Sequence, residues 1–203
     1  MTDIYKVTAG AFAANTYVIT CSNGNCIAVD CCDHEKVSKF LREKNLNCRL
    51  LLLTHAHFDH CGEAALLQRD GAKVYIHEDD FPLVNSDGNL AAAMGQKFVP
   101  FVPDVKVKDG EELELFGHVI RVIQTPGHTP GGACYLFDDE VIFSGDTLFR
   151  LSVGRTDFPC GDFAALRTSV REKLFTLSKD YKVYPGHGMP TSIAFERDNN
   201  RYV

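Results

Sequence analysis

The sequence predicts a single α/β domain, and two observations support this. Strand-like and helix-like hydrophobic patterns alternate along the chain, which is typical of α/β proteins. The 203 residues, of which 45% are apolar, are enough for one sizeable core, and no linker-like stretch divides them. We therefore expect one domain that spans residues 1–203.

The first half of the chain supplies strands and two short helices. Alternating apolar residues predict strands at 4–8, 16–20, 27–30, 49–53 and 73–76. Asn23-Gly24 is typical of a hairpin turn. Helical spacing predicts helices at 35–44 and 63–68, the second of which ends at Asp70-Gly71. The strand–helix–strand order indicates an α/β layer.

The second half repeats the strand pattern. Strands are expected at 113–116, 119–123, 133–137, 141–143 and 181–184, and a helix at 163–177. Between the halves, residues 79–103 carry scattered glycines and prolines and no clear period. This segment is either a packed connector or a flap over an active site, since long loops are often functional.

Charge and composition exclude several classes of function. The net charge is −6, and none of the 21 Lys and Arg residues form a run, so a nucleic-acid partner is not expected. The N-terminus has no signal-peptide pattern and no apolar window approaches 18 residues, so we expect a cytoplasmic protein without a membrane partner. No feature of the sequence indicates an oligomeric state.

Eight cysteines are present, without a CxxC motif or paired clusters. In a reducing cytoplasm we expect most of them to be small buried residues rather than disulfides or a structural zinc site. Cys61 follows a candidate metal ligand directly. It is interpreted as a neighbour of the metals, because other side chains already fill the coordination shell.

The strongest functional signal follows the apolar run Leu50–Leu53. His55 and His57 lie two residues apart on an extended strand end, so their imidazoles project to the same side and can grip one metal ion. Asp59 and His60 follow the bend and can aim at a second point nearby. This stretch predicts half of a two-metal site.

Three further strands end in residues of the same kind. His128 follows one strand in a turn held by proline and glycine, Asp146 follows the next, and His187 follows the last. Together with the first stretch they supply seven nitrogen or oxygen ligands, one of them able to bridge, which suits two adjacent divalent metals. Zinc is expected, and iron and manganese are also compatible with imidazole and carboxylate ligands.

Three other polar residues are assigned no metal. Asp30 ends a strand at the same edge, and we expect it to accept a hydrogen bond from a ligand histidine or to cap a loop. His77 ends a strand without a matching neighbour and is interpreted as a surface residue or a support for the site. His118, on a turn, is expected to be solvated.

The motifs THAHFDH, PGHTPGG, SGDTLF and PGHG, in this order, resemble those of the metallo-β-lactamase fold superfamily over essentially the whole chain. The resemblance implies a four-layer αβ/βα sandwich with its site at one edge. It further implies that His55, His57 and His128 hold one metal, that Asp59, His60 and His187 hold the other, and that Asp146 bridges them.

The stretch from Gly154 to Phe158 is similar to that of small glyoxalase II-like hydrolases and of persulfide dioxygenases. The first resemblance implies hydrolysis of a thioester such as an S-2-hydroxyacylglutathione by a metal-bridging hydroxide, with Asp59 orienting it. The second implies a mononuclear iron dioxygenase. Glyoxalase II proper has a helical C-terminal domain and a tyrosine two residues after its last ligand histidine. Here only residues 188–203 follow His187, and residue 189 is Met.

Substrate choice is expected to reside in residues 79–103 and in the tail 190–203, because the ligands are shared by the whole superfamily. Phe98, Phe101 and Met94 are predicted to form an apolar wall. Arg155 could anchor a substrate carboxylate or pair internally with Asp157 or Asp162. The remaining candidates for such an anchor are Arg197 and Arg201.

Overall fold

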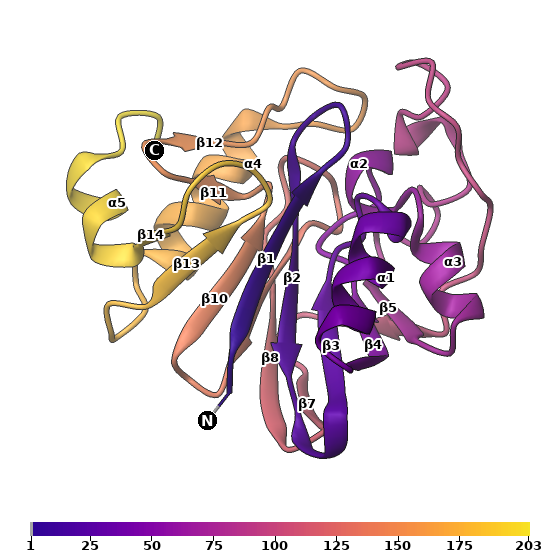
Figure 1. Ribbon diagram of the computed structural model, residues 1–203. Coiled ribbons are helices and arrows are strands. Elements are labelled where there is room, and N and C mark those ends of the chain that lie inside the picture. Colours follow the sequence, from indigo (N-terminus) through magenta and orange to yellow (C-terminus); the bar gives the residue numbers. More distant parts are fainter. Residues whose placement is uncertain (1) are drawn as a thin grey trace.

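Two six-stranded sheets face each other in a computed structural model that describes residues 2–203 (Figure 1). The first sheet has the order β1 (Ile4–Ala9), β2 (Ala14–Thr20), β3 (Asn25–Val29), β4 (Asn47–Leu52), β5 (Lys73–His77) and β6 (Val105–Val107). The second has the order β14 (Thr191–Ser192), β13 (Lys182–Pro185), β10 (Val141–Gly145), β9 (Ala133–Phe137), β8 (His118–Gln124) and β7 (Glu112–Leu115). A small hairpin joins β11 (Leu148–Phe149) to β12 (Ser152–Val153).

Helices cover the outer face of each sheet (Figure 1). The first sheet carries α1 (His34–Glu43), α2 (Phe58–Cys61) and α3 (Ala64–Arg69). The second carries α4 (Phe163–Thr168), its π-helical continuation η3 (Ser169–Leu174) and α5 (Ile193–Asn199). Two short 3₁₀ turns complete the elements, η1 (Ser22–Gly24) in the β2–β3 hairpin and η2 (Asp87–Asn89). The resulting helix–sheet–sheet–helix order confirms the predicted four-layer αβ/βα sandwich.

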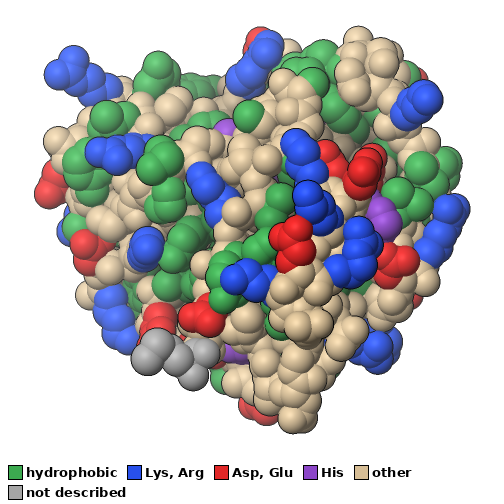
Figure 2. Space-filling model, viewed as in Figure 1, with side chains coloured by type: hydrophobic (Ala, Val, Ile, Leu, Met, Phe, Trp, Pro, Cys, Tyr) green, Lys and Arg blue, Asp and Glu red, His purple; other side chains and the backbone are tan. Residues whose placement is uncertain are grey.

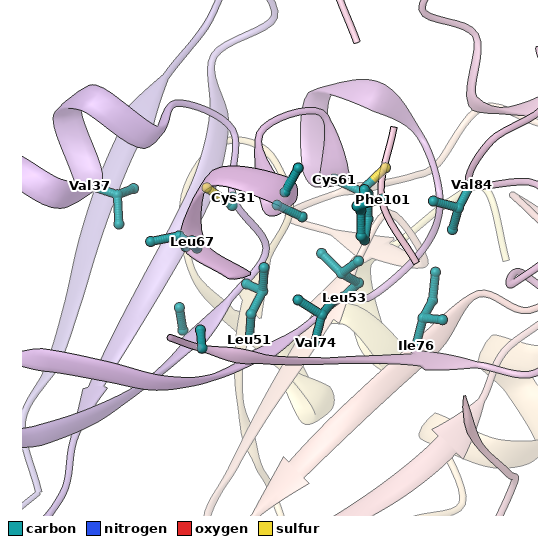
Figure 3. Close-up of a cluster of buried hydrophobic side chains, with 14 of the residues drawn as sticks. Cys31, Val37, Leu51, Leu53, Cys61, Leu67, Val74, Ile76, Val84 and Phe101 are labelled. Carbon is teal, nitrogen blue, oxygen red and sulfur yellow. The ribbon is translucent and has the colours of Figure 1, made fainter. Parts of the chain in front are cut away.

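The apolar run 50–53 shows why these strands are buried on both faces. Leu50 and Leu52 point between the two sheets, whereas Leu51 and Leu53 point toward the helices. Figure 3 shows Leu51 and Leu53 in the helix-side cluster. Side chains alternate along a strand, so an unbroken apolar run satisfies two cores at once.

Strand direction brings the candidate residues to one edge. In the first sheet β3, β4, β5 and β6 run parallel. In the second, β8 and β10 are both antiparallel to β9, and β13 is parallel to β10. The residues that follow the carboxyl ends of β4, β8, β10 and β13 therefore lie at one edge of the sandwich. Open α/β sheets commonly bind ligands at this edge.

Some elements differ from the sequence prediction. The strand β6, the small hairpin and β14 were not predicted, because strands of two or three residues show no period. The tail helix α5 was not predicted either. His118 is buried rather than solvated, and its Nδ1 lies 2.7 Å from Oδ2 of Asp138 in the turn between β9 and β10. Every helix within residues 2–203 is too short or too polar to cross a lipid bilayer.

Candidate metal centre

The predicted site residues meet at the shared edge of the two sheets. Three groups of three residues each have their donor atoms within 4.8 Å of one another. These groups are His55 with His57 and His128, His55 with His60 and Asp146, and Asp59 with His60 and His187. Six of these residues follow the strands β4, β8 and β13, and Asp146 follows β10 directly. The seven residues that the sequence singled out thus form one continuous cluster.

The first half of the cluster consists of imidazoles. Nδ1 of His57 lies 2.9 Å from Nε2 of His128. The ring of His55 lies 4.8 Å from each of these two rings, between centroids. All three side chains are buried.

The second half mixes imidazole and carboxylate. Nε2 of His60 and Nε2 of His187 are 3.2 Å apart, and Oδ2 of Asp59 lies 3.4 Å from the latter. Asp146 stands between the halves. Its Oδ2 lies 3.6 Å from His128 Nε2 and 3.5 Å from His187 Nε2, and its Oδ1 lies 3.3 Å from His60 Nε2.

Outer hydrogen bonds fix which nitrogen faces the cluster in four of the five histidine rings. Thr54 Oγ1 donates to Asp30, so it accepts from Nδ1 of His55 at 3.0 Å. The other Nδ1 partners are Asp30 Oδ2 for His60 at 2.8 Å, the Arg155 carbonyl for His128 at 2.6 Å and the Phe12 carbonyl for His187 at 3.1 Å. In these four rings Nδ1 faces outward and Nε2 faces the cluster, as in metal-binding histidines, whereas His57 directs its Nδ1 toward Nε2 of His128.

Burial and charge act differently on the two halves. Burial lowers the pKa of His57 to about 3 and holds the pKa of His55 well below its usual range, so both rings are neutral. Burial also opposes charge on His60 and His187, but Asp146 and Asp59 outweigh it and raise their pKa values to about 9 and about 10. Without a metal, protons therefore hold positive charge beside these carboxylates.

These observations fit a divalent metal centre. Nε2 of His55 and Oδ1 of Asp146 are buried and have no hydrogen-bond partner within residues 2–203. Converging lone pairs without a donor are unfavourable unless a cation lies among them. Imidazole nitrogens and carboxylate oxygens together accept zinc, iron and manganese.

Two buried carboxylates outside the ligand set hold the site loops. Asp30 lies beneath His60, and its Oδ1 also accepts from the backbone N–H of Thr54 at 2.8 Å, which confirms its predicted supporting role. Asp80 was missed by the sequence analysis. It accepts from the backbone N–H of Ala56 at 2.8 Å, from Thr129 Oγ1 at 2.9 Å and from the Gly131 N–H at 2.6 Å.

Asp80 therefore connects the loop after β4 to the loop after β8. Its three donors are far from it in sequence, and no local motif marked it. The only signal that could have found it is its position, three residues after a buried strand at the edge where the site lies.

A glycine permits the close approach of the last ligand loop. A Cβ on Gly186 would lie 2.2 Å from Oδ1 of Asp146 and 2.7 Å from Cε1 of His60. No side chain fits there without moving both groups. The PGHG motif thus needs glycine at this position for packing.

A cavity of about 260 Å³ opens onto the cluster, and Asp59, His57 and His187 reach it. Its apolar wall is formed by Phe12, Phe58, Leu90, Met94, Phe149 and Phe158. From the segment 79–103, Leu90 and the predicted wall residue Met94 line this cavity. The same segment also packs into the core, so it is both connector and wall.

The predicted wall residues Phe98 and Phe101 do not line this cavity. Phe101 is only 6% exposed and lies in the helix-side core (Figure 3), and Phe98 packs beside it with ring centroids 6.2 Å apart. Apolar contacts beneath the loop draw both rings inward. The tail residues Arg197 and Arg201 also lie outside the cavity lining; Nη1 of Arg197 contacts the carbonyl of Phe175.

Arg155 does line the cavity. Its Nε and Nη2 donate to the two carboxylate oxygens of Asp157 at 2.9 and 2.8 Å, and its guanidinium lies 4.3 Å from the centre of the Phe158 ring. Both side chains of the ion pair are about two-thirds exposed. The internal pair and the position at the cavity therefore coexist.

Other predictions had mixed outcomes. Cys61 is buried and directs its sulfur to the Ala56 carbonyl at 3.1 Å, not to the cluster. His77 is buried rather than a surface residue, with Nδ1 3.3 Å from the backbone nitrogen of Asp79.

On the face shown in Figure 2, Lys and Arg side chains are interspersed with Asp and Glu side chains.

Comparison with known proteins supports the geometry. Residues 9–187 match the family model described as the metallo-beta-lactamase superfamily. The hydroxyacylglutathione hydrolase GloC of Haemophilus influenzae is 37% identical over 174 residues, which cover 83% of this chain and 82% of the relative.

Two solved structures have the same fold over nearly their full length. One is the BLEG-1 B3 metallo-beta-lactamase, with a TM-score of 0.91 and 30% identity, covering 98% of this chain and 99% of the other. The second is TTHA1623 in a di-iron-bound form, with a TM-score of 0.88 and 35% identity, covering 98% and 100%.

Proposed function

Because the chain belongs to the metallo-beta-lactamase superfamily, we propose that it is a metal-dependent hydrolase that cleaves a thioester such as an S-2-hydroxyacylglutathione. The observation that carries this proposal is the pair of donor groups on either side of Asp146, next to a cavity with an apolar wall. The similarity to a hydroxyacylglutathione hydrolase supports the thioester as substrate class.

In this proposal the residues divide into two metal-holding groups. His55, His57 and His128 would hold one divalent ion. Asp59, His60 and His187 would hold the second, and Asp146 would be shared between both. Zinc is the proposed metal, and iron and manganese suit the same donors. When bound, such ions lower the pKa of a coordinated water to about 7 and polarise a carbonyl oxygen.

The protein's own contribution is position and proton handling. Asp59 lies at the cavity, partly exposed, with Oδ2 3.4 Å from His187 Nε2. It is placed to orient a nucleophilic water and to accept its proton. The thiol that leaves has a pKa of about 8.5, so it departs as a thiolate without a dedicated general acid. Phe58 and Phe158 exclude water from the acyl group.

Arg155 is the proposed anchor for a substrate carboxylate. Its partner Asp157 is exposed, and exposed ion pairs are weak, so a bound carboxylate can compete for the guanidinium. Arg155→Ala is expected to raise KM for glutathione thioesters several-fold. KM for an acyl thioester that lacks carboxylates should stay unchanged.

The test is a substrate panel with metal-loaded protein. Thiol release from S-acylglutathiones is measured beside oxygen uptake with glutathione persulfide and cleavage of a β-lactam. We expect thiol release, reduced at least about 100-fold in Asp59→Asn. Oxygen uptake without thiol release would instead establish the mononuclear iron dioxygenase. Preferred β-lactam cleavage would also overturn the thioester proposal.

Metal content is a second, independent test. Elemental analysis of the purified chain is expected to give about two divalent ions per chain. One ion per chain in an active protein, with Asp59→Asn still fully active, would contradict the two-metal arrangement.

A further inference from the structure

Two cysteines lie opposite each other on neighbouring strands, far from the metal centre. Cys26 in β3 and Cys48 in β4 are direct partners in the parallel register. Both side chains belong to the helix-side cluster of the first sheet. Neighbouring strands are about 4.8 Å apart, which is within the Cα separation of about 4.4–6.8 Å that a disulfide requires.

The two sulfurs differ in access. Cys26 is fully buried, whereas Cys48 is partly exposed and lines a separate cavity of about 180 Å³. Arg42 and Arg49 line the same cavity. Of the two thiols only Cys48 reaches this cavity, where two guanidinium groups and the carboxylate of Asp70 also lie.

The contact between the thiols favours a reactive Cys48. Sγ of Cys48 lies 3.4 Å from the Leu50 carbonyl, and the neighbouring Cys26 thiol lowers the pKa of Cys48 while its own pKa is raised. A thiolate is the nucleophilic form of cysteine, and reactive thiols have electropositive, partly exposed surroundings. The remaining cysteine near this end of the sheet, Cys21, belongs to the cluster between the sheets and so lies on the opposite face.

We propose that Cys48 and Cys26 form a peroxide-reactive dithiol, in which Cys48 attacks a small hydroperoxide and Cys26 resolves the product. The Cys48 thiolate attacks the near peroxide oxygen, the O–O bond breaks, and the leaving oxygen takes a proton to give an alcohol or water. Cys48 is then a sulfenic acid. The Cys26 sulfur attacks Cys48, its proton joins the departing hydroxide, and a disulfide and water form.

This site is separate from the metal centre. Cys26 precedes Asp30 by four residues along an extended strand, a span of about 13 Å, and it lies at the opposite end of the strand from the histidines. The dithiol therefore does not depend on the proposed hydrolase activity. A disulfide across adjacent strands is expected to be strained and readily reduced, as regulatory disulfides are.

The test uses the metal-loaded protein and hydrogen peroxide, with peptide mapping by mass spectrometry. We expect a loss of two hydrogen masses located to a Cys26–Cys48 bridge, reversed by a thiol reductant. In Cys26→Ser, Cys48 should stop as a sulfenic acid that dimedone traps. In Cys48→Ser, Cys26 should remain a thiol.

Cys160 is the matched control, because it is exposed and lies in the loop between β12 and α4, outside the first sheet. Cys160→Ser should leave the bridge unchanged, and Cys160 in the wild-type chain should react at least about tenfold more slowly than Cys48. The proposal is overturned if no bridge forms, if Cys48 and Cys160 react at equal rates, or if the Cys48→Ser variant loses its Cys26 thiol as fast as the wild type does.

Discussion

Asp80 provides the sharpest test of how the site is held together. Its carboxylate is fully buried and accepts three hydrogen bonds, from the Ala56 and Gly131 backbone and from Thr129. Asp80→Ala would leave these three donors without an acceptor. Each buried, unsatisfied donor costs about 1–3 kcal/mol.

For each of the three donors we expect a cost at the lower end of this range, about 1 kcal/mol. Burial raises the pKa of Asp80, so the ionised carboxylate is itself costly in this place and its removal recovers part of the loss. We therefore expect the free energy of unfolding to fall by about 3 kcal/mol. At a urea dependence of about 2 kcal/mol per M, the unfolding midpoint shifts by about 1.5 M.

Urea unfolding of the metal-free protein measures this change directly, and chelator competition measures metal binding. Metal affinity should fall about 10–100-fold, because Asp80 holds the loops of His55, His57 and His128. The control is Asp79→Ala, an exposed neighbour expected to change stability by less than about 0.5 kcal/mol. A loss below about 1 kcal/mol for Asp80→Ala, or equal losses for both variants, would refute the reasoning.

Three further predictions address charge, packing and the cavity. In the metal-free protein the pKa of His187 is raised from 6.5 to about 10. The protonated ring therefore contributes fully to the free energy of unfolding below about pH 6.5, and this contribution is lost as the pH rises through 10. In urea unfolding, the free energy of unfolding should fall less between pH 6.5 and pH 10 in His187→Gln than in the wild type. Gly186→Ala should abolish binding of the second metal, as elemental analysis would show. Gly188→Ala should retain two ions, because its Cβ meets nothing within 4 Å, although the φ of +74° at this position will cost some stability. Phe101→Ala should cost about 3–5 kcal/mol of stability in thermal or urea unfolding with KM unchanged, and Met94→Ala should raise KM with stability nearly unchanged; the reverse pattern would place Phe101 at the cavity after all.

The fold was predictable because its main signals are local. Alternating apolar and polar residues marked strands such as β8, and the apolar run 50–53 marked a buried strand. The helix 163–177 was predicted as one element, yet the chain widens into a π-helical segment from Ser169. Such a widening depends on packing against the sheet and leaves no period of its own.

Residues with distant partners could not be assigned. His118 is buried, and its partners Thr20 and Asp138 are 98 and 20 residues away in the sequence. Phe101 was placed at the surface because glycines and prolines surround it in the sequence, but it packs beneath the loop. Asp80 had no local motif at all. In each case the deciding contact is made by tertiary packing.

The candidate ligands could be predicted for the opposite reason. A residue that directly follows a buried strand has its position set by that strand, and four such strands end at one edge. The cavity wall has no such constraint, because Phe12, Phe58 and Phe158 lie in or beside loops whose course depends on neighbouring segments. The metal chemistry is therefore specified by strand ends and can be inferred from motifs. We expect substrate choice to depend on the packing of these loops, and the decisive experiment is to vary the wall residues and Arg155 while leaving every ligand in place.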